Sequence, residues 1–347
     1  MSDPSLIIRS EETKPDFATE AGAVNLASPR LGAKVTDVSD EFFAPRTRML
    51  EDTSPVFYPD RYDEHGKWMD GWETRRRRGG GNDHCILQLG TKGIIAGLNL
   101  NTRFFTGNHP PRARVEAALT YGAPDRNTQW VELLPESDLD PDSPNAFKIN
   151  DDSPYNYIRL NIYPDGGIAR FRVWGNPVPE WDRPDPDGHH ELSAIVNGGR
   201  VVGYNDAHYG DPWVILTSGR GQNMGDGWET RRRRTPGNDW IVIALGAAGI
   251  AKKIEVDTAH FKGNYPERCS ILAANLPPAT SDADILDACR DWETMIPEQN
   301  LQMDHIHIFD STVIDGSVAP ITHIRLNIFP DGGVSRIRVF GPVVEAG

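Results

Sequence analysis

Apolar residues occupy every second position in two short segments of the chain, 158–162 and 324–328. Successive side chains of a β-strand point to opposite faces, so a period of two predicts strands with one buried face. Each segment leads into Pro-Asp-Gly-Gly, at 164–167 and at 330–333. Proline presets φ and glycine tolerates positive φ, which a tight turn needs. The pattern therefore predicts a β-hairpin at the end of each half of the chain.

The remaining segments also favour β structure. Short apolar or alternating segments are separated by turn signals every ~8–12 residues, which is typical of an antiparallel sandwich. The 33 glycines and 27 prolines suit a chain rich in turns. Helix is sparse, and the best candidate is 282–292, with Ser281 as its cap and Ile285, Leu286 and Cys289 on one face. We predict an all-β protein with few short helices.

One nine-residue string occurs twice in the chain. The letters Asp-Gly-Trp-Glu-Thr-Arg-Arg-Arg-Arg fill 70–78 and again 226–234, and both copies soon reach Gly-Asn-Asp. The block Phe-x-Gly-Asn-x-Pro also recurs, at 105–110 and at 261–266. A chance match of this length is negligible, so the chain contains a duplicated unit.

The duplication predicts the domain organisation. We expect an N-terminal tail over 1–23, which is polar, acidic and frayed, and a first repeat over 24–178. A Pro/Asp-rich linker over 179–189 follows, whose prolines exclude a regular element. The second repeat is predicted over 190–347. A chain of 347 residues gives each repeat enough length to bury its own core.

Charge and cysteine usage exclude several classes of protein. The net charge of −14 argues against a protein that coats nucleic acid, despite the arginine runs. No run of ~18 apolar residues occurs and the first 16 residues lack a signal-peptide core, so we predict no membrane partner. Cys85, Cys269 and Cys289 form no CxxC motif and cannot all pair. A cytoplasmic protein of a reducing compartment is therefore expected.

The twice-written string, the Phe-x-Gly-Asn-x-Pro blocks and the Ile-Arg-Leu-Asn-Ile-Tyr/Phe-Pro-Asp-Gly-Gly segments together resemble the allantoicase family, the allantoate amidinohydrolases of purine breakdown. The resemblance covers roughly residues 24–342. It implies two similar jelly-roll sandwiches of the galactose-binding-like type. It also implies hydrolysis of allantoate, the small-molecule partner, to ureidoglycolate and urea. Fold similarity to sugar-binding modules would not by itself establish this chemistry.

Allantoate is a carboxylate whose α-carbon carries two ureido groups, so its site needs a cation and hydrogen-bonding groups. Guanidinium matches a carboxylate with two parallel hydrogen bonds. If residues 72–78 form a strand, every second side chain shares the face opposite Trp72, although a bulge would exchange the faces. That face carries Glu73 in the first copy and Glu229 in the second. The arginines on it, which we predict to bind substrate, are Arg75, Arg77, Arg231 and Arg233.

The reaction calls for proton transfer. The central carbon is an aminal, so one ureido nitrogen can expel the other as urea once the leaving group is protonated, and water then adds. A carboxyl group can serve as the acid and then as the base. Glu73 and Glu229 are the first candidates. Asp70 and Asp226 come second, because an aspartate before glycine is more often a turn residue.

Other polar motifs have structural interpretations. Asn-Asp at 82–83 and 238–239 precedes apolar strands and is expected to form turns and strand entries, and the Gly-Asn-x-Pro blocks are expected to be turns. No histidine near these motifs is shared by both copies. His109, for example, aligns with Tyr265.

A metal site has only partial support. His305 and His307 would share one face of a strand beside Asp304, and such a set could bind a metal. The first repeat lacks the pair and no further ligand is evident from spacing. We therefore predict no cofactor and leave a divalent metal open.

Two alternatives to the hydrolase are a non-catalytic tandem module that binds carboxylates or sugars and a scaffold whose arginine runs dock an acidic partner. Urea release from allantoate distinguishes the hydrolase from both. The sequence is compatible with one or two active repeats and with a homo-oligomer.

Overall fold

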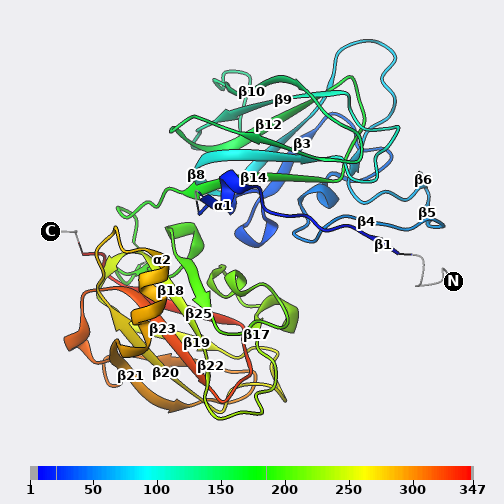
Figure 1. The fold of residues 1–347 in the computed structure, drawn as a ribbon. Coiled ribbons are helices and arrows are strands. Elements are labelled where there is room, and N and C mark those ends of the chain that lie inside the picture. The colour runs from blue at the N-terminus through cyan, green and yellow to red at the C-terminus, as the bar shows by residue number, and fades with distance from the viewer. Residues whose placement is uncertain (1–6, 21, 185, 345–347) are drawn as a thin grey trace. The chain divides into compact units, whose positions relative to one another are not determined.

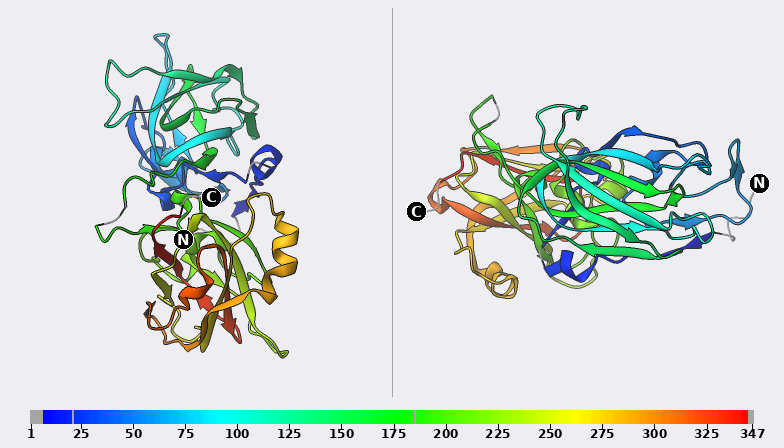
Figure 2. Two further views of the ribbon diagram at one scale, coloured as in Figure 1. Left: turned by 90° about the vertical axis from the view of Figure 1, so that its left-hand side faces the viewer. Right: turned by 90° about the horizontal axis from the view of Figure 1, so that it is seen from above.

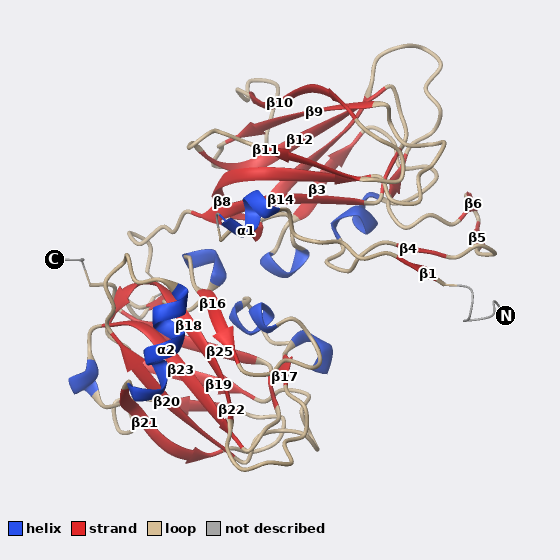
Figure 3. Ribbon diagram, viewed as in Figure 1, coloured by secondary structure: helices blue, strands red, loops and turns tan. Residues whose placement is uncertain are grey.

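The computed structural model describes residues 7–20, 22–184 and 186–344, and the chain divides after Val178 into two compact units. Residues 1–6 and 21 of the predicted tail, Asp185 of the predicted linker and residues 345–347 of the predicted second repeat lie outside the described residues. Strands dominate both units and helices are few and short, as predicted (Figure 3). Among the described residues, no helix is long and apolar enough to cross a membrane.

The first unit is an antiparallel sandwich whose two layers share one long strand (Figure 1). Its longer strands are β3 (Lys34–Val38), β8 (Asp83–Asn101), β9 (Arg112–Ala118), β10 (Val131–Asp138), β11 (Pro144–Lys148), β12 (Pro154–Tyr163) and β14 (Arg170–Pro177). Its shorter elements are β1 (Ile8–Arg9), α1 (Asp16–Glu20), β2 (Val24–Asn25), β4 (Val56–Phe57), β5 (Tyr62–Asp63), β6 (Gly66–Lys67), β7 (Trp72–Glu73) and β13 (Gly167–Ile168), with 3₁₀ turns at Pro29–Leu31 and Arg46–Leu50. The first part of β8 pairs with β3 and β12, and its last part pairs with β11 and β14.

The second unit repeats this arrangement, with the long strand divided into β18 and β19. Its strands are β15 (His190–Glu191), β16 (Arg200–Tyr204), β17 (Trp228–Glu229), β18 (Asp239–Gly249), β19 (Lys253–Asp257), β20 (Arg268–Ala274), β21 (Glu293–Asn300), β22 (Ile306–Phe309), β23 (Ile321–Phe329), β24 (Gly333–Val334) and β25 (Arg336–Gly341). Its helices are α2 (Asp282–Ala288) and 3₁₀ turns at Ile195–Asn197, Pro212–Leu216, Met224–Asp226, Cys289–Asp291 and Gly316–Val318. One layer is β16-β18-β23-β20-β21 and the other is β15-β25-β19-β22.

The predicted apolar buried face is present in both strands that precede Pro-Asp-Gly-Gly, although in β23 Arg325 and Asn327 on the opposite face are buried as well. Ile158, Leu160 and Ile162 of β12 have no exposed surface, and the apolar positions of 324–328 in β23 are equally buried. These side chains fill the space between the layers, where burial of apolar surface drives folding.

The predicted hairpins are wrong, although the turn itself is present. β12 and β14 do not pair with each other, because each pairs with β8 in a different layer. The backbone groups of the turn form hydrogen bonds with the repeated string instead. The Thr74 amide donates to Gly166 O at 3.1 Å, and Gly167 pairs with Glu73. A Cβ at residue 167 would lie 2.0 Å from the Phe105 ring, so only glycine fits there.

The predicted helix is present but shorter than expected. Ser281 caps α2 by accepting a hydrogen bond from the Asp284 amide at 3.2 Å, and the helix ends at Ala288 before a 3₁₀ turn. The apolar residues Ile285 and Cys289 are buried, as predicted. The helix lies along the outside of the second unit, where it is seen on the right of the left-hand view (Figure 2).

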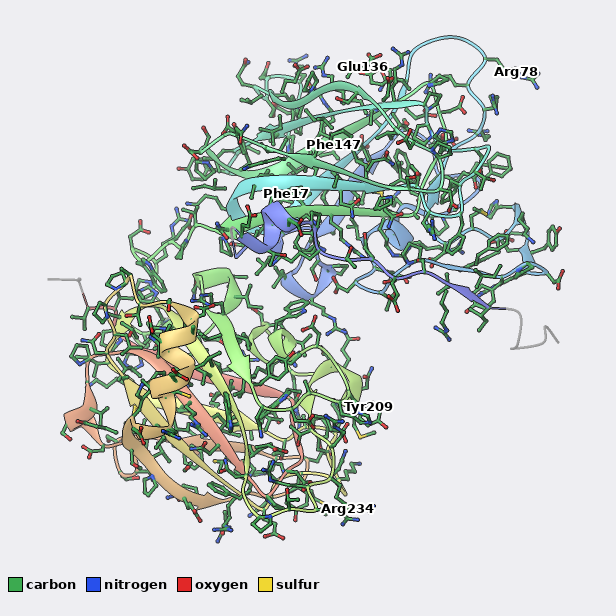
Figure 4. All side chains as sticks on the ribbon, viewed as in Figure 1. Phe17, Arg78, Glu136, Phe147, Tyr209 and Arg234 are labelled. Atoms are coloured by element: carbon green, nitrogen blue, oxygen red, sulfur yellow. The ribbon has the colours of Figure 1, made fainter. Side chains whose placement is uncertain are left out.

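The expected fraying of the N-terminal tail is wrong for its described residues. β1 pairs with β4, and the Glu12 carboxylate accepts from the buried Arg172 guanidinium at 2.8 Å. Asn99 and Asn101 also donate to Glu12, each at 3.2 Å. The acidic residues of this segment suggested a solvated tail, but one of them, Glu12, is the partner of the buried Arg172 cation. Phe17, in the same segment, lies close to β8 (Figure 4).

Candidate active site

The repeated string holds Glu73 between two other segments of the first unit. The Glu73 amide donates to Ala44 O at 3.1 Å on one edge of β7, and Gly167 pairs with it on the other. Trp72 is fully buried and its indole Nε1 donates to Asp40 O at 2.8 Å. Because side chains alternate along a strand, Glu73 points the opposite way and keeps part of its surface exposed.

The strand predicted over 72–78 ends at Glu73, and the arginines that follow are all exposed. Arg75 Nη2 lies 2.6 Å from Asp40 Oδ2, and Arg77 donates to the buried Asp83 at the same distance. These two arginines, predicted to bind substrate, therefore already have carboxylate partners within the unit. Arg78 lies on an outer loop (Figure 4).

The second copy reproduces these ion pairs. Arg231 contacts Asp206 at 2.6 Å and Arg233 contacts Asp239 at 2.7 Å. The Asn-Asp pairs do mark strand entry as predicted, since β8 begins at Asp83 and β18 at Asp239. They also anchor the arginine runs, a role that the sequence did not indicate.

A cavity of about 390 Å³ opens beside Glu73, within the size range of small-molecule sites. The residues around it include Phe43, Glu73, Arg76, Asn108, His109 and Asp165. Apart from Phe43, which precedes the Ala44 bridge to Glu73, they come from the string, from the Phe-x-Gly-Asn-x-Pro loop and from the Pro-Asp-Gly-Gly turn. Three of the repeated motifs thus meet at one place.

Glu73 has the electrostatic character of an acid. Burial raises the pKa of Glu73 above its ordinary value of 4.5, and a hydrogen bond from Asn108 Nδ2 to Oε1, at 2.7 Å, offsets part of this shift. A carboxyl with a raised pKa keeps its proton to higher pH and can donate it to a leaving group. In the second unit, Asn264 donates to Glu229 in the same way.

The cation at the cavity is Arg76, which the alternation argument assigned to the opposite face. Its Nε lies 3.8 Å from Asp165 Oδ1, and 73% of its side chain is exposed. That contact is longer than the 2.6 Å ion pair of Arg77 with Asp83. Arg76 is therefore the arginine of the first run that both borders the cavity and has a loose carboxylate contact.

Asp70 and Asp226 lie in buried ion pairs and do not border the cavity. Asp70 Oδ2 contacts Arg170 Nη2 at 2.8 Å and also accepts from the Val56 amide at 2.8 Å. Asp226 Oδ2 contacts Arg336 Nη2 at 2.9 Å. Each pair joins the start of the string to the strand after the Pro-Asp-Gly-Gly turn.

Asn108 and His109 were not predicted as site residues. The Gly-Asn-x-Pro block was assigned only a turn, and it does form one, but the Asn108 side chain reaches Glu73. A signal for this role was present, because asparagine recurs at the same place in both copies although a turn tolerates several residues there.

Of the two histidines considered for a metal, His307 has other partners, and the His305 ring packs edge-on against it. His307 Nε2 accepts from the Gln302 amide at 2.7 Å, and Nδ1 lies 3.0 Å from Val256 O. Both ring nitrogens are thus used within the unit. Asp304 accepts from the His260 amide at 2.9 Å and contacts Arg220 at 3.3 Å. Within the described part of the chain, no three or more His, Cys, Asp or Glu side chains form a group that could hold a metal.

A family model described as "Allantoicase repeat" matches residues 24–178 and again 190–344. "Probable allantoicase 1" of Burkholderia mallei is 49% identical over 333 residues, which cover 96% of this chain and 97% of that protein. "Probable allantoicase" of Ralstonia nicotianae is 51% identical and covers 94% and 96% of the two chains. A crystal structure of allantoicase from Saccharomyces cerevisiae, 33% identical, superposes with a TM-score of 0.76 over 93% of this chain and 94% of that one.

Replacement Asp70→Asn should destabilise the first unit. It would leave the fully buried Arg170 guanidinium without its close charged partner, because its other carboxylate contact, with the exposed Glu51, is 3.9 Å long. Loss of such a buried partner costs about 3–5 kcal/mol of unfolding free energy. Denaturant unfolding followed by tryptophan fluorescence measures the loss. Arg183→Ala, which removes an exposed contact with Glu180, should change the free energy by less than about 1 kcal/mol. Equal effects of the two replacements would contradict the structural role of Asp70.

Glu73→Gln should change how stability depends on pH. Because the pKa of Glu73 is raised on folding, protonation of Glu73 stabilises the folded state of the wild type. This contribution to the free energy of unfolding is lost as pH rises from 4.5 through the folded pKa. The variant lacks this titration, so its stability relative to wild type should increase with pH across that window and then level off. Urea unfolding at a series of pH values tests this. Glu64→Gln, at a side chain 86% exposed, is the control. A constant difference between wild type and Glu73→Gln would refute the shift.

Proposed function

The chain belongs to the allantoicase family, and from this premise we propose that it hydrolyses allantoate to ureidoglycolate and urea in the cavity beside Glu73. The observation that supports this location is the meeting of a half-buried glutamate of raised pKa, a loosely held arginine and further polar side chains, among them Asn108 and His109, around one cavity. Such a combination of perturbed acid and anion-binding group is typical of a catalytic site.

Arg76 is our candidate for the substrate carboxylate. Arg75 and Arg77 would each have to leave a carboxylate at 2.6 Å before binding another, whereas Arg76 would give up only a contact of 3.8 Å. Arg75 and Arg77 then act by holding the segment, so that Arg76 projects toward the cavity. In the second copy, Arg231 and Arg233 make the same ion pairs on either side of Arg232, the counterpart of Arg76.

Glu73 is our candidate for proton transfer. Asn108 binds Oε1, while no described residue donates a hydrogen bond to Oε2. Protonated Glu73 donates its proton to the leaving ureido nitrogen as the bond from that nitrogen to the central carbon breaks, which releases urea and leaves an N-acyliminium ion, in which the remaining ureido nitrogen keeps its proton. The resulting carboxylate then takes a proton from the water that adds to the carbon, and Glu73 is protonated again.

We further propose a cytoplasmic enzyme without a nucleic-acid or membrane partner. The net charge of −14 disfavours polyanions. Cys85, Cys269 and Cys289 are buried and unpaired, and burial raises the pKa of Cys85 and Cys269 to about 12. Unpaired thiols of this kind suit a reducing compartment.

The proposed activity is tested with purified protein. We expect urea to be released from allantoate and not from arginine or agmatine, because the site is matched to a carboxylate next to two ureido groups. A coupled urea assay measures the product. Binding of allantoate without urea release would instead indicate a carboxylate-binding module, and urea from arginine alone would exclude the proposed reaction.

Glu73→Gln should lower kcat by ~10²–10⁴-fold with little change in KM, because the amide keeps the shape and hydrogen bonding but cannot transfer the proton. Steady-state kinetics with allantoate measure both constants, and circular dichroism checks folding. Glu64→Gln serves again as the exposed control. If Glu73→Gln keeps the wild-type kcat while Glu229→Gln loses it, the reaction belongs to the second repeat.

A further inference from the structure

The two repeats are identical in most of the residues around the cavity but differ at three positions. Glu73, Thr74, Arg76, Asn108 and Asp165 have identical counterparts in the second copy. The differing pairs are Phe43 and His208, His109 and Tyr265, and Pro111 and Glu267. The second copy therefore keeps the framework around this place and changes part of the wall that the first copy presents to its cavity.

His109 has an unsatisfied polar atom at this wall. Its Nδ1 is buried and has no hydrogen-bond partner among the described residues, while the ring borders the cavity next to Asn108. A buried nitrogen without a partner is unfavourable unless a ligand or water supplies the missing hydrogen bond. The position of His109 thus points to a ligand contact.

The backbone around His109 is firmly held, so the ring does not reach the cavity through a loose loop. The Gly167 amide donates to Asn108 O at 2.8 Å. A Cβ at Gly166 would lie 2.5 Å from Pro110 N, which shows how closely the turn packs against this loop. The same backbone hydrogen bond recurs between the Gly333 amide and Asn264 O. The loop backbone is therefore held in the same way in both units, and the side chain after the asparagine differs.

The chemistry of Nδ1 suits a ureido group. A neutral imidazole nitrogen is a donor in one tautomer and an acceptor in the other, and a ureido group offers both N–H donors and a carbonyl acceptor. The substrate carboxylate already has Arg76 as its partner. In the second copy, Tyr265 replaces the imidazole, and the carboxylate of Glu267 replaces the uncharged Pro111, which makes that copy less suited to an anionic substrate.

We propose that His109 Nδ1 hydrogen-bonds a ureido group of the substrate, and that this contact makes the first repeat the site of turnover. The inference rests on the proposed hydrolysis of allantoate and adds the residue that distinguishes the two repeats. His109 is thereby a specificity-determining residue that touches the substrate.

The experiment compares His109→Leu with Tyr265→Leu, the same replacement at the matched position of the second repeat. We expect His109→Leu to lower kcat/KM for allantoate by ~10–100-fold, the usual effect of losing one hydrogen bond to a buried ligand. Tyr265→Leu should stay within about two-fold of wild type. Equal kcat/KM for His109→Leu and wild type, or an equal loss in both variants, overturns the inference.

Two further variants separate a substrate contact from a packing role. Asparagine can place a polar group near the position of Nδ1, and glutamine places one near Nε2. His109→Asn should therefore retain several-fold more kcat/KM than His109→Gln, and a reversed order overturns the inference even if His109→Leu fails to fold. Wild-type protein that releases no urea from allantoate would refute the proposed function itself, whereas an active wild type with His109 and Tyr265 equivalent refutes only this inference.

Discussion

The short strand β7 is held by backbone hydrogen bonds on both edges, and the site depends on this pairing. Ala44 binds one edge and Gly167 the other, so the strand cannot rotate. Alternation then fixes two consequences at once: Trp72 is buried in the core and Glu73 faces the cavity. The strand before the Pro-Asp-Gly-Gly turn, β12, pairs with β8 and β9 on its two edges. The turn therefore cannot close a hairpin, and the residues after it pair with β7.

A second constraint lies directly behind β7, in the buried pair of Asp70 and Arg170. Removing two charges from water is costly and is offset only when their remaining hydrogen bonds are also satisfied. Here Asp70 accepts from Val56, and Arg170 also donates to Thr53 O and Ala169 O. Asp226 and Arg336 repeat the pair in the second unit. The link between the string and the strand after the turn is therefore part of the framework that both copies retain.

Local sequence patterns predicted the strands and the helix, whereas contacts between residues far apart in the sequence determine which side chains lie at the cavity. The duplication, the buried faces of β12 and β23, and the Ser281 cap all depend on residues close together in the sequence. The end of β7 could not be foreseen, because it depends on Asp40, whose carboxylate accepts from the Arg75 amide 35 residues away. With that bond the arginine run leaves the strand, and Arg76 rather than Arg75 or Arg77 comes to the cavity. The partner of Glu73 was missed for the same reason, since Asn108 also lies 35 residues away in the sequence.

The electrostatics of the cavity connect substrate binding to proton transfer. A nearby cation lowers the pKa of a carboxyl, and burial raises it. At Glu73 burial prevails over the hydrogen bond from Asn108, and Arg76 is largely exposed and already faces Asp165. In the proposed reaction, the allantoate carboxylate adds a negative charge at Arg76 and displaces water from the cavity. Both changes favour the protonated form of Glu73, so the substrate itself increases the fraction of enzyme that holds the proton needed to release urea.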